Sequence, residues 1–331
     1  MMKTWEKVLP MKQSFRRLAS LFITGLLTVA LISACARAAD RNAQSLETSK
    51  NCRVVQHIVG ETCIPLDPKR IIVLGGDDTL GNLLALGMKP VAASSGWDAV
   101  ESFPKHLQNQ LEGVEYVGST TQPSLEKILL LQPDLILSNH HMEAFNDQLS
   151  QIAPTVVVDS DHDPWKQQLL TLSKILDKED IANRLIDNYQ QRIDELKQAL
   201  GDDRTNLVVS VATATQRFGI WAYGSKGPVG NVLDDVGVQR PPSQVGDFDY
   251  TERISLESLD AIDGDVLLLV SWRNESDNNA ISEMQKSPLW QQLEVVRNDQ
   301  VYTVSMDHWD TDHSIFGINA LLDDLFEYLA N

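Results

Sequence analysis

The chain has 331 residues and a formal net charge of −18, with 46 acidic residues against 28 basic ones. Five of the basic residues and one acidic residue precede Cys35, so a mature chain that begins there carries a charge of −22. This acidity argues against partners that are themselves polyanions, namely nucleic acids and anionic membrane surfaces.

The N-terminus has the features of an export signal. Basic residues precede an apolar run over residues 18–32, which is about 15 residues long and therefore short for a spanning helix, which needs about 20. The run ends in Ile32-Ser-Ala-Cys35, a pattern typical of a bacterial lipobox in which Cys35 receives the lipid. The alternative is an ordinary signal peptide that is cut near Ala38-Ala39 and discards Cys35.

These features predict a periplasmic lipoprotein anchored in the cell envelope, with the lipid bilayer as a partner of its N-terminus. Residues 1–34 are expected to be the signal peptide. Residues 35–51 are small and polar without periodicity, so they are expected to form a flexible tether.

Two further cysteines flank a hairpin-like stretch. Cys52 and Cys63 are ten residues apart across a segment with Gly60 near its turn. In an oxidising envelope this spacing favours a disulfide. Paired metal ligands are the alternative, but with only His57 nearby the donor set is poor for zinc.

Short apolar strands alternate with helices along the next hundred residues. Strands are expected at residues 71–74, 90–94, 134–138 and 155–159, with helices between most of them. Nearly all-apolar strands separated by helices indicate a parallel sheet that is covered on both faces. We therefore expect an N-terminal lobe over residues 52–163.

Two helices are expected to link this lobe to a second one. Asp163-Pro164 suits the start of the first, because Asp caps and Pro fits the first turn. The second runs to Leu200 with an apolar stripe at helical spacing, about 33 Å long. Residues 164–204 are assigned to these linking helices, one of them long and rigid. Residues 205–331 are assigned to a C-terminal lobe, with strands at 207–212, 219–223, 265–270 and 301–304 and a helix at 318–329.

One phrase occurs twice, at a separation of 131 residues. Ser124-Leu-Glu-Lys-Ile-Leu-Leu-Leu-Gln-Pro-Asp134 is echoed by Ser255-Leu-Glu-Ser-Leu-Asp-Ala-Ile-Asp-Gly-Asp265, and an apolar strand follows each. The separation is far longer than the period of a solenoid. The fold class predicted from this repeat is α/β, with two Rossmann-like lobes built on mostly parallel sheets.

Motifs for common catalytic chemistry are absent from the sequence. There is no Gly-x-Ser-x-Gly elbow, no phosphate loop and no dinucleotide fingerprint. Residues 307–313 contain His308 and His313 among acidic residues, and with His140 and His141 they suggest a Zn²⁺ or Mn²⁺ cluster, or a metal-dependent hydrolase. The alternative is a solvated acidic loop, which we favour; we expect no catalytic residues, no directly bound metal and no cofactor.

Aromatic and basic residues gather where the predicted strands end. Ligands of open parallel sheets bind beyond the carboxyl ends of the strands. Arginine forks bind anionic oxygens and aromatic faces cover an apolar body, so these residues predict an amphipathic pocket. The candidate ligand-binding residues are Trp97, His141, Arg217, Trp272, Arg273 and Trp309, together with Tyr250 and Arg253 just before the second repeat.

With these features in place, the chain resembles the periplasmic-binding-protein family that delivers ferric siderophores, haem and cobalamin to ABC importers. The resemblance lies in Pro68-Lys-Arg-Ile-Ile-Val-Leu, in Leu83-Leu-Ala-Leu-Gly-Met-Lys-Pro-Val, in the first repeat phrase and in Ser287-Pro-Leu-Trp-Gln-Gln-Leu. It implies two lobes joined by one rigid helix with little hinge closure. It also implies that Glu126 and Glu257 dock on arginines of a two-fold membrane permease, although an acidic residue there would also suit the helix dipole.

The function expected from this resemblance is capture of a ferric siderophore, of hydroxamate or citrate type, by a monomer. Haem, cobalamin or a bare metal ion are the alternative ligands within the same fold. A haem would need an axial ligand, for which His141 or Tyr250 could serve.

Overall fold

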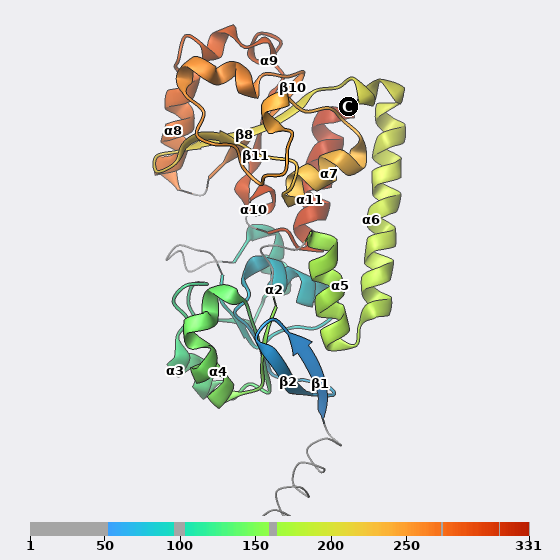
Figure 1. The fold of residues 1–331 in the computed structure, drawn as a ribbon, viewed down its shortest axis with the longest axis vertical. Coiled ribbons are helices and arrows are strands. Elements are labelled where there is room, and N and C mark those ends of the chain that lie inside the picture. Colours follow the sequence, from blue (N-terminus) through green and yellow to red (C-terminus); the bar gives the residue numbers. More distant parts are fainter. Residues whose placement is uncertain (1–51, 96–102, 159–163, 273, 311, 331) are drawn as a thin grey trace, which may run out of the picture. The chain divides into compact units, whose positions relative to one another are not determined.

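The computed structural model describes residues 52–95, 103–158, 164–272, 274–310 and 312–330. Within these ranges the chain builds a two-stranded hairpin and two larger sheets (Figure 1). The expected signal peptide, lipidated Cys35 and tether lie outside the described residues. Within the described ranges, no helix combines the length and the apolar composition that crossing a membrane requires.

The N-terminal sheet has five parallel strands in the order β5-β4-β3-β6-β7. The strands β3, β6 and β7 consist of apolar residues, Ser and Thr, and they are wholly buried because helices cover both faces of the sheet. We call this sheet, with α2 to α4, the N-terminal lobe. Its elements are β3 (Ile71–Val73), α2 (Gly76–Ala85), β4 (Ala92–Ala93), η1 (Lys105–Gln110), β5 (Glu115–Tyr116), α3 (Leu125–Leu130), β6 (Leu135–Ser138), η2 (His140–Phe145), α4 (Asn146–Ile152) and β7 (Thr155–Val157).

The C-terminal sheet has four strands in the order β11-β10-β8-β9. We call it, with α7 to α11, the C-terminal lobe. Its elements are β8 (Val209–Thr215), β9 (Gly219–Ala222), α7 (Pro228–Val236), η4 (Pro242–Gln244), η5 (Leu256–Ile262), β10 (Val266–Ser271), α8 (Glu275–Gln285), η6 (Trp290–Gln292), α9 (Glu294–Arg297), β11 (Val301–Ser305), α10 (Met306–Trp309) and α11 (Ile315–Leu329).

One strand of this sheet runs against the direction of the others. β9 pairs antiparallel with β8, whereas β10 is parallel to both β8 and β11. The sheet is therefore mostly parallel, as predicted, with β9 as the exception. Only residues 216–218 separate β8 from β9, and so short a loop can join only antiparallel neighbours. Gly219 begins β9 with a φ of +76°, a conformation that favours glycine.

The two repeat phrases occupy matching places in the two lobes. Asp134 precedes β6 and its carboxylate accepts hydrogen bonds from the backbone N–H groups of Lys69 and Arg70, at 2.7 and 2.9 Å. Asp265 precedes β10 and accepts one from the N–H of Val208 at 2.7 Å. Each aspartate thus ties the start of its own strand to the start of a neighbouring one, which explains why the phrase recurs.

The helical part of the phrase differs between the lobes. α3 is a regular α-helix whose N-cap Ser124 accepts a hydrogen bond from the N–H of Lys127 at 3.4 Å. The second copy, η5, is a 3₁₀ segment with a kink at Ser258. The two copies therefore share their position in the lobes but not their helical geometry.

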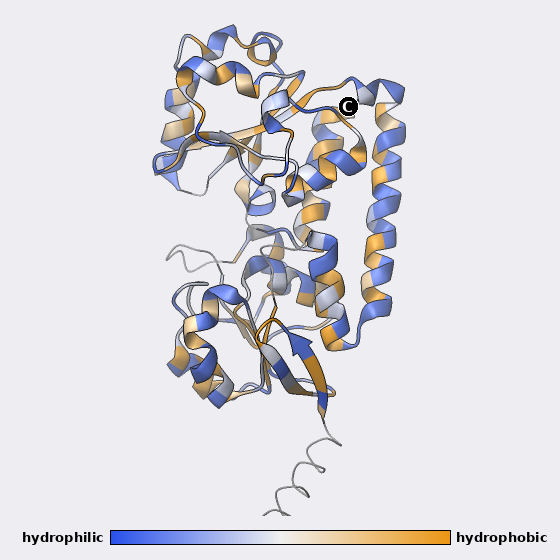
Figure 2. Ribbon diagram, in the orientation of Figure 1, coloured by the Kyte–Doolittle hydropathy of each residue, from blue (hydrophilic) through white to orange (hydrophobic). Residues whose placement is uncertain are grey.

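Two helices connect the lobes, α5 (Trp165–Leu176) and the 22-residue α6 (Glu179–Leu200), followed by η3 (Asp202–Thr205). Figure 2 shows that both are amphipathic, with apolar residues along one side. A cluster of polar contacts joins them to α7: Lys166 and the Tyr189 hydroxyl both lie 2.7 Å from a carboxylate oxygen of Asp235. The rigidity of α6 and the lobe boundaries at residues 163 and 204 stay predictions.

The hairpin precedes the N-terminal sheet. β1 (Cys52–His57) and β2 (Gly60–Pro65) pair with each other, and Cys52 and Cys63 are disulfide-bonded, as expected. The Thr62 hydroxyl donates to the carbonyl of Thr155 in β7 at 3.0 Å. The hairpin strand β2 is therefore fastened to the edge of the N-terminal sheet.

Candidate ligand-binding site

Four aromatic side chains meet near the carboxyl end of β8. Trp221 is at the centre of this aromatic cluster, with its ring centroid 5.1 Å from that of Tyr223, 4.8 Å from Tyr250 and 6.2 Å from Trp272. Tyr223 and Tyr250 also contact each other at 5.4 Å. Edge-to-face packing of this kind holds aromatic rings in defined orientations.

Strand alternation explains how the cluster forms. Trp221 and Tyr223 project from one face of β9 and contribute to one core cluster, while Ile220 and Ala222 project from the other face into a second cluster. Residues 249–254 run antiparallel beside β9, where Tyr223 bridges to Tyr250. The chain after β9 thus returns along its edge and adds a third ring to the same face.

A hydrogen bond fixes the fourth ring. Trp272 follows β10, and its indole N–H donates to the hydroxyl of Thr213 on β8 at 2.7 Å. Thr213 lies opposite Trp221 in the β8–β9 pair. The indole therefore lies across the end of the sheet, where a ligand of an α/β protein is expected.

A half-buried carboxylate accepts hydrogen bonds from the two tyrosines. Asp310 follows α10, and its oxygen Oδ1 accepts hydrogen bonds from the hydroxyls of Tyr223 at 2.8 Å and Tyr250 at 3.5 Å. Burial raises the pKa of the Asp310 carboxyl, although the Tyr223 hydroxyl and the charge of His313 lower it. Burial followed by the charge of Asp310 raises the pKa of Tyr250 well above its usual range, so its phenol stays protonated.

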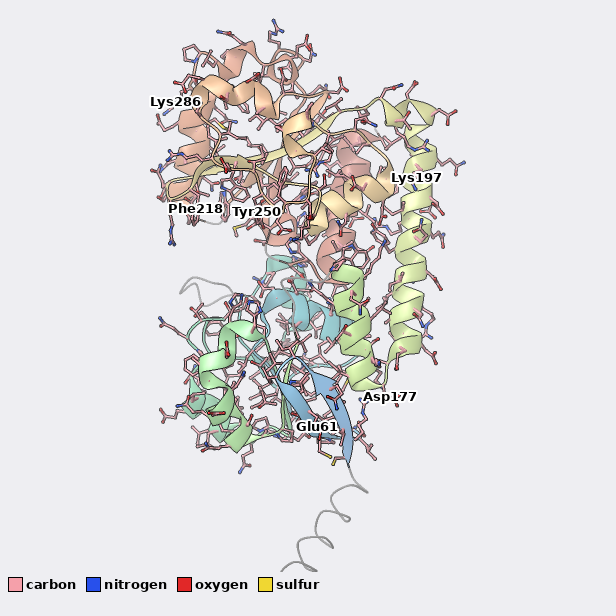
Figure 3. All side chains as sticks on the ribbon, viewed as in Figure 1. Glu61, Asp177, Lys197, Phe218, Tyr250 and Lys286 are labelled. Carbon is pink, nitrogen blue, oxygen red and sulfur yellow. The ribbon has the colours of Figure 1, made fainter. Side chains whose placement is uncertain are left out.

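Tyr250 is accessible to solvent and yet surrounded by protein. Its side chain is 46% exposed, but desolvation is the main reason for its raised pKa. Its ring contacts those of Trp221 and Tyr223 and its hydroxyl lies 3.5 Å from Asp310, so part of the side chain faces protein and part faces solvent. Figure 3 shows Tyr250 and Phe218 along the same side of the C-terminal lobe.

The N-terminal lobe reaches the same place through α2. The charge of Asp78 contributes to the raised pKa of Tyr250, and the Asp78 carboxylate accepts a hydrogen bond from the N–H of His313 at 2.5 Å. α2 begins just after the carboxyl end of β3. The ends of strands from both sheets therefore approach each other near the aromatic cluster.

The other residues predicted to bind ligand lie outside the aromatic cluster, on different elements of the two lobes. Arg217 is exposed in the β8–β9 loop, with its guanidinium 4.9 Å from the ring centroid of Phe218. Arg253 lies against Gly219, where an added Cβ would be 2.4 Å from its Nε. His141 follows β6 in η2, with its ring centroid 3.9 Å from that of His140. Trp97 and Arg273 lie outside the described residues.

Trp309 does not belong to the site, which corrects the prediction. Its side chain is wholly buried, and its indole N–H donates to the carboxylate of Asp324 at 2.7 Å. The residue follows β11 as expected, but the helical turn α10 directs its ring into the core, where it packs with α11 residues such as Leu325. A ligand outside the protein cannot reach it.

The residues of the candidate metal cluster make contacts with other protein groups. His308 pairs with Asp324 at 2.8 Å and Asp307 is buried. Among the residues that the structure describes, no three His, Cys, Asp or Glu side chains are grouped so that they could hold a metal ion. The predicted solvated loop is also wrong for this segment, since residues 306–309 form a helical turn.

Three members of the site were not predicted: Trp221, Tyr223 and Asp310. The two aromatics were within a predicted strand, and their spacing of two already indicated a shared face. Asp310 carries no sequence signal that separates it from its acidic neighbours.

The two repeat glutamates lie on the surface. Glu126 is exposed in the first turn of α3, and Glu257 is fully exposed at the corresponding point of η5. A backbone hydrogen bond and the Ser255 hydroxyl lower the pKa of Glu257, so it is charged near neutral pH.

Comparisons with known proteins agree with this architecture. The family model described as Periplasmic binding protein matches residues 72–307. The chain is 34% identical to "Probable siderophore-binding lipoprotein YfiY" of Bacillus subtilis, over 93% of this chain and 97% of that one. It is 29% identical to "Fe(3+)-citrate-binding protein YfmC" of the same organism, over 97% and 100%. The structure of Staphylococcus aureus SirA complexed with staphyloferrin B superposes with a TM-score of 0.71 at 29% identity, covering 84% of this chain and 98% of that one.

Proposed function

Because the chain belongs to the periplasmic binding protein family, we propose that it captures a ferric siderophore of hydroxamate or citrate type and delivers it to an ABC permease. The observation that carries this proposal is the aromatic cluster, which presents the half-exposed Tyr250 at the end of the C-terminal sheet. The relatives named for siderophores and ferric citrate support the choice of ligand.

The chemistry of the site suits such a chelate. A ferric hydroxamate or citrate complex has a rounded, partly apolar body with anionic oxygens at its surface. The exposed ring of Tyr250 and the part-buried indoles of Trp221 and Trp272 can cover the body. Arg217 in the β8–β9 loop and Arg253 beside Gly219 can bind the oxygens. His141 and the undescribed Trp97 and Arg273 complete the proposed set.

Haem is a poorer candidate than a chelate. An axial tyrosine binds iron as a phenolate, whereas the Tyr250 hydroxyl donates to Asp310 and its pKa is raised. We propose that the iron is ligated by the siderophore alone, so that the protein needs no cofactor and catalyses no reaction.

Delivery is proposed to use the two lobes together. Glu126 and Glu257 occupy the same place in the two repeats and are both exposed, which suits a two-fold permease with an arginine for each. We further propose that the protein is a monomer, anchored outside the cytoplasm by a lipid on Cys35, in keeping with relatives named as lipoproteins.

Tryptophan emission provides the test, because Trp221 and Trp272 are in the site. The full chain would be titrated with ferric citrate, a ferric trihydroxamate, haem and cobalamin, and with each iron-free chelator as control. We expect quenching at micromolar or lower concentrations by a ferric chelate and little by the iron-free form. Saturable binding of haem or cobalamin alone would contradict the proposal.

A further inference from the structure

A short segment of the C-terminal lobe is hydrogen-bonded to the N-terminal lobe. We call residues 312–315 the junction segment; they comprise the end of the connection from α10 to α11 and the first residue of α11. The N–H of His313 donates to the carboxylate of Asp78, and the N–H of Ile315 donates to the side-chain oxygen of Asn82 at 3.1 Å. Both acceptors are on α2, 233 or more residues away in sequence.

A third contact comes from η1. The ring nitrogen Nε2 of His106 lies 2.5 Å from oxygen Oδ2 of Asp312, whose other oxygen accepts from the N–H of Ser314 at 2.8 Å. Asp312 is wholly buried and His106 is about one-fifth exposed. An acidic side chain is rarely buried in this way unless both oxygens have partners.

The surfaces also fit closely. A Cβ added to Gly81 of α2 would lie 2.1 Å from the hydroxyl oxygen of Ser314, so only glycine leaves room for the segment. Ser314 is wholly buried and caps α11 by accepting hydrogen bonds from the N–H groups of Phe316 and Gly317. The segment is therefore fixed at once to α2 and to the start of α11.

The junction segment adjoins the proposed site. Asp310, which accepts from both tyrosine hydroxyls, is two residues before Asp312. Asp78 binds the junction segment and its charge acts on Tyr250. A shift of the segment against α2 would thus change the spacing between the aromatic cluster and the strand ends of the N-terminal lobe.

From this arrangement we infer that the junction segment fixes the spacing of the two lobes at the ligand site, and that Asn82, His106 and Asp312 are positioning residues for ligand binding. The ligand-binding part of this inference rests on the proposed function. If all molecules hold the lobes at the spacing that binds the ligand, the measured Kd equals the intrinsic Kd. If only a fraction of the molecules hold that spacing, the measured Kd rises to the intrinsic Kd divided by that fraction.

The experiment measures the spacing and the affinity separately. Nitroxide labels on a ketone-bearing amino acid at Lys127 and Lys286, both exposed, leave the disulfide intact and report the distance between lobes by electron spin resonance. Asn82→Ala removes the oxygen that accepts the hydrogen bond from the N–H of Ile315. His106→Gln weakens the contact with Asp312, and His106 is part-exposed. The two variants are independent, so one that fails to fold does not remove the test.

Asp263→Ala is the matched control. Its carboxylate accepts the backbone N–H groups of Glu294 at 2.8 Å, Val295 at 3.0 Å and Gly264 at 3.1 Å, and all three lie in the same lobe as Asp263. The Asp263→Ala variant should lower the free energy of unfolding without altering the distance between the two labels.

We expect Asn82→Ala and His106→Gln to broaden the distance distribution of the unliganded chain, while saturating ferric chelate narrows it again. The Kd for the chelate should rise about tenfold in Asn82→Ala, as expected if only about a tenth of the molecules hold the bound spacing. Distributions as narrow as those of the parent chain in both variants would overturn the inference. If no ferric chelate binds even the parent chain, the proposed function fails, while the distance measurement still decides the role of the junction.

Discussion

Removal of the Tyr250 ring should weaken ligand binding substantially while leaving the fold intact. Aromatic side chains bury roughly 150–250 Å² each, so the exposed 46% of Tyr250 corresponds to roughly 70–115 Å². At about 25 cal/mol per Å², covering that area with a ligand contributes about 2–3 kcal/mol. This is an upper limit, because a bound chelate covers only part of the ring.

We therefore expect Tyr250→Ala to raise the Kd for a ferric chelate by between about tenfold and hundredfold. Isothermal titration calorimetry with ferric citrate and with a ferric trihydroxamate measures this change directly. Tyr250→Phe retains the ring and loses only the 3.5 Å hydrogen bond to Asp310, which keeps its shorter bond from Tyr223. It should bind within about threefold of the parent chain, since one weak hydrogen bond is a small contribution.

Tyr302→Ala controls for the general effect of losing a tyrosine. Tyr302 is on β11 and stacks on Tyr328 at 4.8 Å, away from the aromatic cluster. It should change the free energy of unfolding but not the Kd. A Tyr250→Ala protein that binds as tightly as the parent chain would refute the reasoning, because the exposed ring would then contribute no contact to the ligand.

Three other predictions follow from the surface and the hairpin. Charge reversal at both Glu126 and Glu257 should abolish chelate uptake by cells while the Kd of the isolated protein stays unchanged; an equal loss of affinity would place the glutamates in the binding site instead. Replacing Cys52 and Cys63 by serine should lower the free energy of unfolding by about 2–3 kcal/mol, because the disulfide closes a loop of roughly ten residues; denaturant melts check this, and unchanged midpoints would contradict it. Burial lowers the pKa of His57 from 6.5, so the folded state binds its proton less readily than the unfolded one, and stability should fall as the pH drops below about 6.5. His57→Gln should remove this slope from unfolding measured between pH 7 and pH 5, and an identical slope would exclude His57 as its source.

Much of the fold could be predicted because its signals are local. The apolar strands, the helices between them and the repeat with Asp134 and Asp265 depend on neighbouring residues, and the structure has them where the sequence placed them. The antiparallel direction of β9 was not predicted, because the composition of an apolar strand does not indicate whether it pairs parallel or antiparallel. The loop of three residues before Gly219 was the available signal.

The site was only partly predictable because it depends on contacts between distant residues. Strand-end placement singled out Trp272, and the position just before the second repeat singled out Tyr250. Both rings contact Trp221 in the structure. The same rule failed for Trp309, whose ring turns inward because its indole N–H finds Asp324 on α11. Asp310 pairs with two tyrosines that lie 60 and 87 residues earlier in the chain, and no local sequence pattern predicts such a contact.

Native mass spectrometry of the protein, purified without denaturation from its own cell envelope and again after incubation with ferric chelates, tests the central claim most directly. Our account predicts one adduct per chain with the iron isotope pattern and the combined mass of a chelator and one ferric ion, and none with the iron-free chelator. An adduct with the mass of haem or of a corrinoid, or a chain that stays free of ligand in the presence of every ferric chelate, would contradict it.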